Sequence, residues 1–233
     1  NSTYSSRLGN RLNVSSVLLA ASVLLAPLVF TSAATAQTTA LTSVRGVGNQ
    51  SFTGALGMDF TVAAGGITVT QLGAFDSGQN GFSSAISVGI FNFNTQTIVA
   101  GLSASLTTNN TVADGQSRFI DNADVFLAAG NYSIVAVGYG PNEQNGNAGL
   151  GGTPPTINTG GGLVTFFGAA RNLNGTTALV FPTLVDSGPA NRYDAGTFKF
   201  VAGNTTAAPE PGSLALLLPV MGAVGIVLRR RRK

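Results

Sequence analysis

Acidic side chains are the strongest catalytic candidates in this chain, because it contains neither histidine nor cysteine. Two facing carboxylates can hydrolyse a glycosidic bond, and Asp121 and Asp124 are close in sequence, while Asp76 lies in a run of turn residues. Spacing alone places no pair of them across a cleft. Since Asp commonly accepts backbone hydrogen bonds in turns, we interpret residues 121–124 as a turn before a strand and Asp76 as the cap of its own turn. The chemistry therefore predicts no catalytic residue and no enzyme, with a secreted carboxylate-dependent glycan hydrolase as the alternative.

Two binding chemistries remain as further alternatives. Calcium prefers six to eight oxygen ligands, and Asp76, Ser77, Asn80 and nearby glycine carbonyls could supply some of them, although no calcium-loop spacing is present. A weak calcium site is thus the only cofactor we consider. A carbohydrate-binding module is also open, but the chain has no tryptophan, and its aromatic residues are better explained as core on alternating strand positions, among them Tyr132, Tyr139 and Tyr193.

The charge distribution argues against nucleic acid as a partner. The chain carries 12 basic residues, but five of them form its extreme end and two lie near its start, at Arg7 and Arg11. Residues 37–208 hold five basic and eight acidic side chains, a net charge of −3. Binding to nucleic acid depends on basic side chains that neutralise phosphates, and this region has no such patch.

The middle of the chain predicts β-strands. Apolar and polar residues alternate with a period of two, and glycine- and asparagine-rich turns separate the runs. This pattern predicts an all-β fold, a single antiparallel β-sandwich or jelly-roll-like domain over residues 37–203. A glycine-, asparagine- and proline-rich stretch at 141–162 predicts a long exposed loop, and residues 204–208 a short linker. The strand pattern is clearest at residues 60–62, 67–72, 86–93, 132–139 and 198–200.

The first 36 residues predict a secretory signal. Arg7 and Arg11 precede an apolar run at residues 17–30, and small residues follow at Ala34 and Ala36. That order is typical of a signal peptide and places the cut before Gln37. The predicted partners are signal peptidase and the export machinery.

The last 25 residues predict a membrane-spanning segment. Pro209, Glu210 and Pro211 precede seventeen uncharged residues, 212–228. A helix of this length spans about 26 Å, slightly less than the hydrocarbon core of a bilayer. The basic cluster after it belongs in the cytoplasm by the positive-inside rule, which places the body outside. That cluster consists of Arg229, Arg230, Arg231, Arg232 and Lys233.

This order of motif, apolar segment and basic end resembles the PEP-CTERM sorting signal, found in many Gram-negative bacteria that secrete exopolysaccharide. The resemblance covers residues 209–233 and implies recognition by exosortase, a membrane protease-transpeptidase, with cleavage near Pro209-Glu210-Pro211. The membrane helix would then be a transient inner-membrane anchor. An ordinary, permanent C-terminal anchor is the alternative.

Part of the middle region resembles a secreted β-sandwich module of unknown function, through residues 68–76, 81–82, 88–91 and 125–132. The resemblance covers about residues 50–140 and implies a fold rather than an activity. The expected protein is therefore exported to the cell surface or extracellular matrix, with a non-enzymatic structural or interaction role associated with exopolysaccharide.

Overall fold

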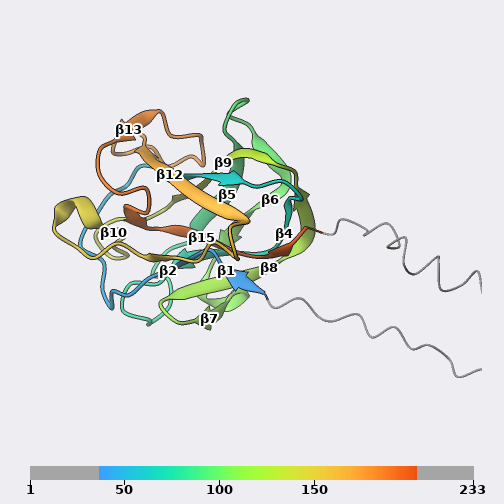
Figure 1. The fold of residues 1–233 in the computed structure, drawn as a ribbon. Coiled ribbons are helices and arrows are strands. Elements are labelled where there is room, and N and C mark those ends of the chain that lie inside the picture. The colour runs from blue at the N-terminus through green and yellow to red at the C-terminus, as the bar shows by residue number, and fades with distance from the viewer. Residues whose placement is uncertain (1–36, 204–233) are drawn as a thin grey trace, which may run out of the picture. The chain divides into compact units, whose positions relative to one another are not determined.

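The computed structural model describes residues 37–203, which form an all-β fold of two curled antiparallel sheets (Figure 1). The predicted signal with Ala34 and Ala36, the linker at 204–208 and the tail at 209–233 lie outside the described residues. Within residues 37–203, no helix is long and apolar enough to cross a membrane.

Each sheet is ordered by antiparallel hydrogen-bonded neighbours. In spatial order, the five-stranded sheet consists of β1 (Thr38–Thr39), β15 (Gly196–Ala202), β4 (Ile67–Phe75), β8 (Ser117–Leu127) and β7 (Val112–Asp114). The six-stranded sheet consists of β13 (Leu184–Asp186), β12 (Val164–Arg171), β3 (Leu56–Val62), β9 (Gly130–Val137), β5 (Ile86–Asn92) and β6 (Ile98–Leu106). Two short pairs join β10 (Gly146–Asn147) to β14 (Tyr193–Asp194) and β11 (Thr156–Ile157) to β2 (Leu41–Thr42), and the two 3-10 turns are η1 (Thr108–Asn110) and η2 (Ala148–Leu150).

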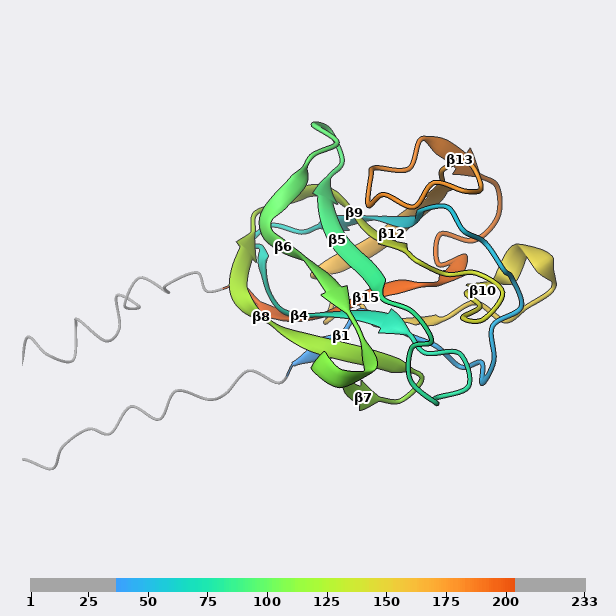
Figure 2. The same ribbon diagram turned by 180° about the vertical axis from the view of Figure 1, so that it is seen from behind.

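The core lies between the two sheets and is built from the alternating residues that the sequence indicated. Phe60 on β3 is fully buried, with its ring centroid 4.9 Å from that of Phe198 on β15 and 5.5 Å from that of Phe166 on β12. Such aromatic contacts add to the free energy gained by burying the rings. The tyrosines Tyr132, Tyr139 and Tyr193 are all buried, which confirms their prediction as core residues. Figure 2, the view from behind, shows β6 and β8 side by side where the sheets approach each other.

Two local predictions fail because of backbone irregularities. Asp121 and Asp124 are not in a turn before a strand; both lie inside β8 and are exposed. The register of β8 against β4 shifts here, so that residues 122–124 lie opposite Thr70 alone, as in a β-bulge. A strict period of two places Tyr139 on the same face as Val135 and Val137, but its side chain packs in the main core with Tyr132. Gly138, with a φ of +117°, changes the direction of the chain between Val137 and Tyr139.

The segment 141–162 also differs from the long exposed loop that its composition predicted. It contains β10, η2 and β11, and its side chains Glu143, Asn145 and Asn147 are at most 2% exposed. The prediction of exposure is therefore wrong for these residues. Composition misleads here because the segment is held by hydrogen bonds of its amides rather than by apolar burial.

The first and last described strands are neighbours. Thr38 on β1 pairs with Phe200 on β15, so the chain enters and leaves the domain at the same end of this strand pair. The opposite end, where β15 begins at Gly196 and β4 ends at Phe75, is called the distal end below. Asp76 directly follows the end of β4, and Asp194 comes two residues before the start of β15.

Candidate functional site

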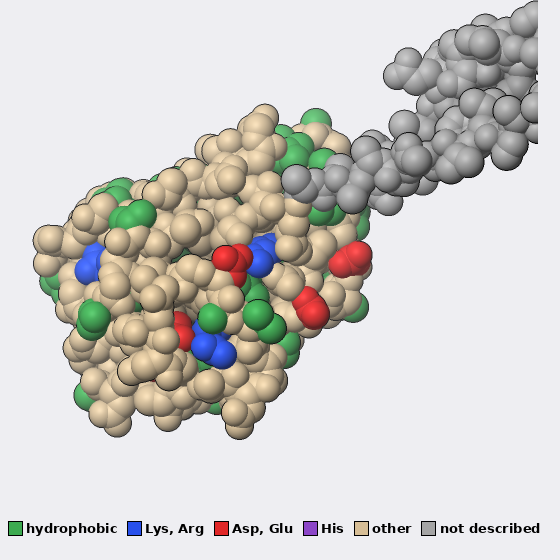
Figure 3. Space-filling model, turned by 90° about the horizontal axis from the view of Figure 1, so that it is seen from below, with side chains coloured by type: hydrophobic (Ala, Val, Ile, Leu, Met, Phe, Trp, Pro, Cys, Tyr) green, Lys and Arg blue, Asp and Glu red, His purple; other side chains and the backbone are tan. Residues whose placement is uncertain are grey.

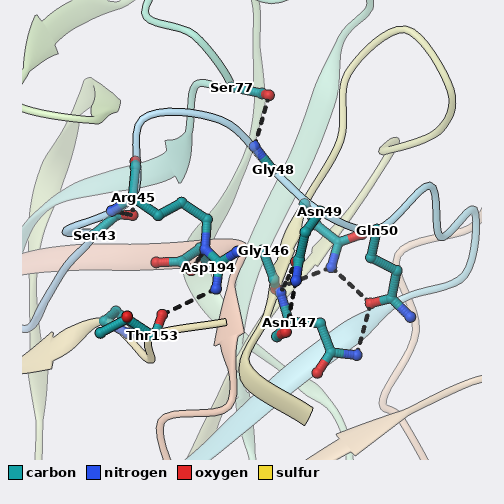
Figure 4. A network of polar contacts seen from close by, with 12 residues as sticks. Ser43, Arg45, Gly48, Asn49, Gln50, Ser77, Gly146, Asn147, Thr153 and Asp194 are labelled. Atoms are coloured by element: carbon teal, nitrogen blue, oxygen red, sulfur yellow. Dashed lines mark hydrogen bonds and ion pairs between the residues drawn. The ribbon is translucent and has the colours of Figure 1, made fainter. Parts of the chain in front are cut away.

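The densest group of buried polar side chains lies at the distal end (Figure 4). It joins residues 43–50, the turn at 76–83, residues 143–153 and strand β14, and we call it the distal network. These segments are far apart in sequence, and each contributes side chains that hold the backbone of another.

An ion pair lies at the centre of the distal network. The Nε atom of Arg45 donates to Oδ2 of Asp194 over 2.9 Å, and its Nη2 atom donates to the carbonyl oxygen of Thr153 over 3.0 Å. Asp194 is 3% exposed, and burial raises the pKa of its carboxyl group although Arg45 acts in the opposite direction. A side chain at Gly146 would overlap the carboxylate of Asp194, so glycine is needed at that position.

Two further carboxylates hold the turn at residues 76–83. Glu143 is 2% exposed and accepts hydrogen bonds from the backbone N–H groups of Ser77 and Ser83, both over 3.0 Å. Burial raises the pKa of Glu143, while those N–H groups oppose the rise. Asp76 accepts from the N–H of Gly81 over 3.0 Å, which confirms that it caps its own turn.

Amide side chains complete the distal network as a ladder between residues 49–50 and 145–147. Asn49 accepts from the N–H of Asn147 over 2.7 Å and donates to its carbonyl oxygen over 3.1 Å. The side-chain oxygen of Gln50 accepts from the amides of both Asn145 and Asn147 over 2.9 Å. This ladder was not predicted from the sequence. The feature of the sequence that indicates it is the clustering of asparagine and glutamine at residues 49–50 and 144–147.

Two of the three side chains considered for calcium, those of Asp76 and Ser77, are engaged in other contacts. Oδ2 of Asp76 lies 3.5 Å from Nη1 of Arg118 in addition to its bond from Gly81, and Oγ of Ser77 accepts from the N–H of Gly48 over 3.0 Å. A guanidinium so close to the carboxylate disfavours a second cation there. Within the described part of the chain, no group of three or more His, Cys, Asp or Glu side chains is arranged to hold a metal ion.

A second polar region lies on the outer face of the five-stranded sheet. Nζ of Lys199 is 2.8 Å from Oδ2 of Asp114 and 4.4 Å from the ring centroid of Phe119, a cation–π contact. The Phe119 ring lies over Gly73, where a Cβ atom would come within 2.5 Å of it. Figure 3 views the side on which β1, β7 and β8 lie in Figure 1, and shows a few acidic and basic side chains next to each other on a largely uncharged surface.

A hollow of about 50 Å³ lies beside this ion pair, between the β1–β2 segment and the turn that joins β7 to β8. Its walls carry hydroxyl, amide and carboxylate groups above the aromatic ring of Phe119. Such groups donate and accept hydrogen bonds, so the hollow offers hydrogen bonds to part of a hydroxylated ligand, beside the apolar side chains of Leu41 and Phe119. The polar lining residues are Thr39, Thr42, Ser43, Asp114, Gln116 and Ser117.

No known protein family, curated protein or solved structure matches this chain. The predicted cleavage residues Ala34 and Ala36 and the sorting motif Pro209-Glu210-Pro211 lie outside the described residues; Gln37 is the first described residue. The structure thus brings together Asp76, Ser77, Glu143 and Asp194 at one end, and leaves Asp121 and Asp124 on the surface of β8.

Proposed function

We propose that this chain is an exported protein of the cell surface or extracellular matrix, sorted through a C-terminal PEP-CTERM signal by exosortase. Its body is a single jelly-roll-like β-sandwich with a non-enzymatic structural or interaction role, associated with exopolysaccharide. The N-terminal segment is a cleaved secretory signal, and the C-terminal apolar segment spans the inner membrane transiently.

The pairing of β1 with β15 is the observation that carries this proposal. The predicted cut before Gln37 comes one residue ahead of β1, and β15 ends at Ala202, before the linker at 204–208. Processing at both predicted places would leave every described strand intact. Because Thr38 pairs with Phe200, both processed ends would leave the domain from the same place, opposite the distal end.

The contacts of the buried carboxylates, which hold backbone groups and an arginine, support a non-enzymatic role. Glu143 and Asp76 accept backbone N–H groups, and Asp194 pairs with Arg45. Carboxylates that hold backbone groups in this way stabilise loops. Asp121, from the acidic pair considered for catalysis, accepts a hydrogen bond from Gln71 on the neighbouring strand over 2.5 Å.

Processing is tested by replacing the two motif prolines together, Pro209→Ala with Pro211→Ala. We expect the variant to stay in the inner-membrane fraction, while the unmodified chain is released with new termini that mass spectrometry locates near Gln37 and Pro209. The matched control is Pro219→Ala, which changes a proline inside the apolar segment. Equal release of the double variant and the unmodified chain would contradict sorting through the motif.

Export is tested separately with single cysteines, since the chain contains none. Ser103→Cys places a thiol at an exposed position of β6, and Ala74→Cys places one at a fully buried position of β4. In cells that have released or surface-displayed the protein, a membrane-impermeant maleimide should label the first and spare the second. Labelling of Ser103→Cys only after lysis would contradict an external location.

Association with polysaccharide is tested at the hollow beside Asp114. Calorimetric titration with the host's own exopolysaccharide should show binding that Gln116→Ala weakens about fivefold, because a well-placed hydrogen bond contributes about 1 kcal/mol. Asp124→Ala on the exposed surface of β8 is the control and should bind normally. Equal weakening by both substitutions, or no binding at all, would remove the hollow as the contact.

A further inference from the structure

Residues 172–183, called the strap below, cover the outer face of the six-stranded sheet next to β13 (orange in Figure 1). Its residues Leu179 and Phe181 pack against a small apolar cluster on that face, separate from the main core. Pro182 lies over Gly57 on β3, where a Cβ atom would come within 2.5 Å of the proline Cγ. The strap thus shields from water a face that would otherwise be exposed. The cluster consists of Ala55, Phe91, Val135 and Val137.

An acid and a hydroxyl lie unpaired beneath this cover. Asp59 on β3 and Ser133 on β9 are direct cross-strand partners, 6% and 0% exposed. Their neighbours Met58 and Phe60 belong to the main core, so Asp59 points to the outer face. Oδ1 of Asp59 and Oγ of Ser133 are both buried without a hydrogen-bond partner among the described residues.

Aromatic rings close over the two strands that carry this pair. The ring centroid of Phe93, just after β5, is 5.5 Å from that of Phe167 on β12 and 5.7 Å from that of Phe181 in the strap. Strands β5 and β12 are separated by β9 and β3, which places them roughly 14 Å apart at the usual strand spacing. The side chains of Phe93 and Phe167 must therefore lean towards each other across β3 and β9.

Within residues 37–203, no cation compensates Asp59. Residues 172–183 contain no charged side chain, and neither do β5 and β9; the ring of Tyr132 on β9 belongs to the main core on the opposite face. On β12 the only charge is Arg171, which forms an ion pair with Asp186 of β13. An ionised carboxylate buried without a partner is strongly disfavoured, so such a group stays protonated or regains water. Burial raises the pKa of Asp59. The hydroxyl of Ser133 lies on the partner position of β9 without forming a hydrogen bond in this geometry, and its proximity lowers the pKa by less than burial raises it.

The strap is the segment that can open locally. A hollow of about 350 Å³ lies within it, lined by Leu173, Val180, Phe181 and neighbouring residues. Leu173 is 72% exposed and Val180 is 40% exposed, so several of its apolar side chains gain little from burial. The ends of the strap are better held, since Asn172 accepts from the N–H of Thr183 and Asn174 accepts from the N–H and hydroxyl of Thr53. Loosely packed segments with exposed contacts open at low free-energy cost.

We propose that the strap is a pH-controlled cover, closed over a protonated Asp59 and opened when that carboxyl group ionises, which uncovers the apolar outer face of the six-stranded sheet. The folded closed state holds a proton that the open state releases. Rising pH therefore favours opening, and falling pH favours closure. This inference rests on the described domain alone and does not require the proposed export route.

A cysteine reporter in the full chain tests this directly. Leu179→Cys places a thiol on the packed side of the strap, and Leu173→Cys places one on its exposed side as the matched control. Both thiols are labelled with a neutral disulfide reagent, and the rate for Leu179→Cys is divided by the rate for Leu173→Cys. This ratio removes the change in reactivity that comes from ionisation of the thiol in solvent. We expect this ratio to rise at least tenfold with pH, through a single-proton transition.

The Asp59→Asn background then isolates the acid, because asparagine keeps the shape and cannot ionise. There the ratio should stay low at every pH, while Ala74→Cys, fully buried in the main core, stays unreactive throughout in both backgrounds. Hydrogen exchange of residues 172–183 in the unmodified chain should show the same pH dependence without any substitution. A ratio that does not change with pH, or one that rises equally in the Asp59→Asn background, overturns the proposal.

Discussion

The distal network and the space beneath the strap both bury carboxylates, but they supply them with different partners. At the distal end, Glu143 accepts two backbone N–H groups, and Asp194 pairs with Arg45 through its Oδ2 atom, while its Oδ1 atom is buried without a partner among the described residues. Beneath the strap, Asp59 has no cation and its Oδ1 has no donor among residues 37–203. Burial is similar at all three positions, since none is more than 6% exposed. The difference lies in the backbone around them.

Chain turns supply free donors, and the middle of a sheet does not. The N–H groups of Ser77, Gly81 and Ser83 lie in a turn and have no strand partner, so they point at carboxylates. The backbone of β3 is paired on both sides, with β9 and with β12. Its N–H groups are used within the sheet, and a side chain on its face finds none. A buried carboxylate therefore finds backbone donors at the distal end and none on the face beneath the strap.

Loss of the central ion pair should have the largest effect. Arg45→Ala leaves Asp194 buried without its cation, and breaking a buried pair by removing one partner costs about 3–5 kcal/mol. Urea unfolding followed by circular dichroism measures this loss. The double variant Arg45→Met with Asp194→Leu should lose much less, because neither charge is left behind. A cost below about 1 kcal/mol for Arg45→Ala would mean that Asp194 resembles Asp59.

Removal of Glu143 should come next. Glu143→Ala removes the charged acceptor of the N–H groups of Ser77 and Ser83, and we expect the loss of these two hydrogen bonds to cost about 3 kcal/mol. Glu143→Gln keeps one acceptor oxygen and should cost about 1 kcal/mol. Hydrogen exchange at these two amides should accelerate in the alanine variant, while exchange in β3 stays slow. Equal costs for the two variants would show that the carboxylate does not hold the turn through these bonds.

A pair of polar-to-alanine substitutions sharpens the contrast between the two regions. Asn145 is fully buried, donates to Gln50 and Gly146 and accepts from the N–H of Phe52, so Asn145→Ala should cost about 2 kcal/mol. Ser133 is equally buried, but its hydroxyl has no partner, so Ser133→Ala should change stability by less than about 0.5 kcal/mol. Thermal unfolding of both variants provides the measurement. A large loss for Ser133→Ala would indicate a hydrogen bond beneath the strap.

The sequence predicted the sheets well because a period of two depends on local side-chain placement. Phe60, Phe198 and Phe200 alternate with polar residues and all lie in the core. Predictions failed where one backbone position changes the period, as at Gly138 before Tyr139 and at residues 122–124 of β8. A bulge is a property of two paired strands, and neither strand shows it alone.

The buried polar regions could not be predicted for a related reason. Asn145 and Asn147 lie in a segment with the composition of an exposed loop, and they are buried only because they pair with Asn49 and Gln50, about 95 residues earlier. Asp59 lies in a correctly predicted strand, but its unpaired state depends on a strap that begins more than 100 residues later. The sequence identified Asp76 as a turn cap because that interaction is local.

The smallest expected effect has the opposite sign to the others. Asp59→Asn should stabilise the fold at neutral pH, because it removes the ionisable group that lacks a partner. The pKa of Asp59 is raised by burial, so between the ordinary Asp range, near 3.9, and the raised value the native state holds a proton that the unfolded state has lost. The unmodified chain therefore loses stability as pH rises through this window, and the asparagine variant does not. Urea unfolding over a pH series should show the difference between the two grow through the window and then level off. Ser133→Ala retains the acid and should follow the unmodified chain; a difference that is constant with pH would mean that the carboxyl group of Asp59 titrates alike in the folded and unfolded states.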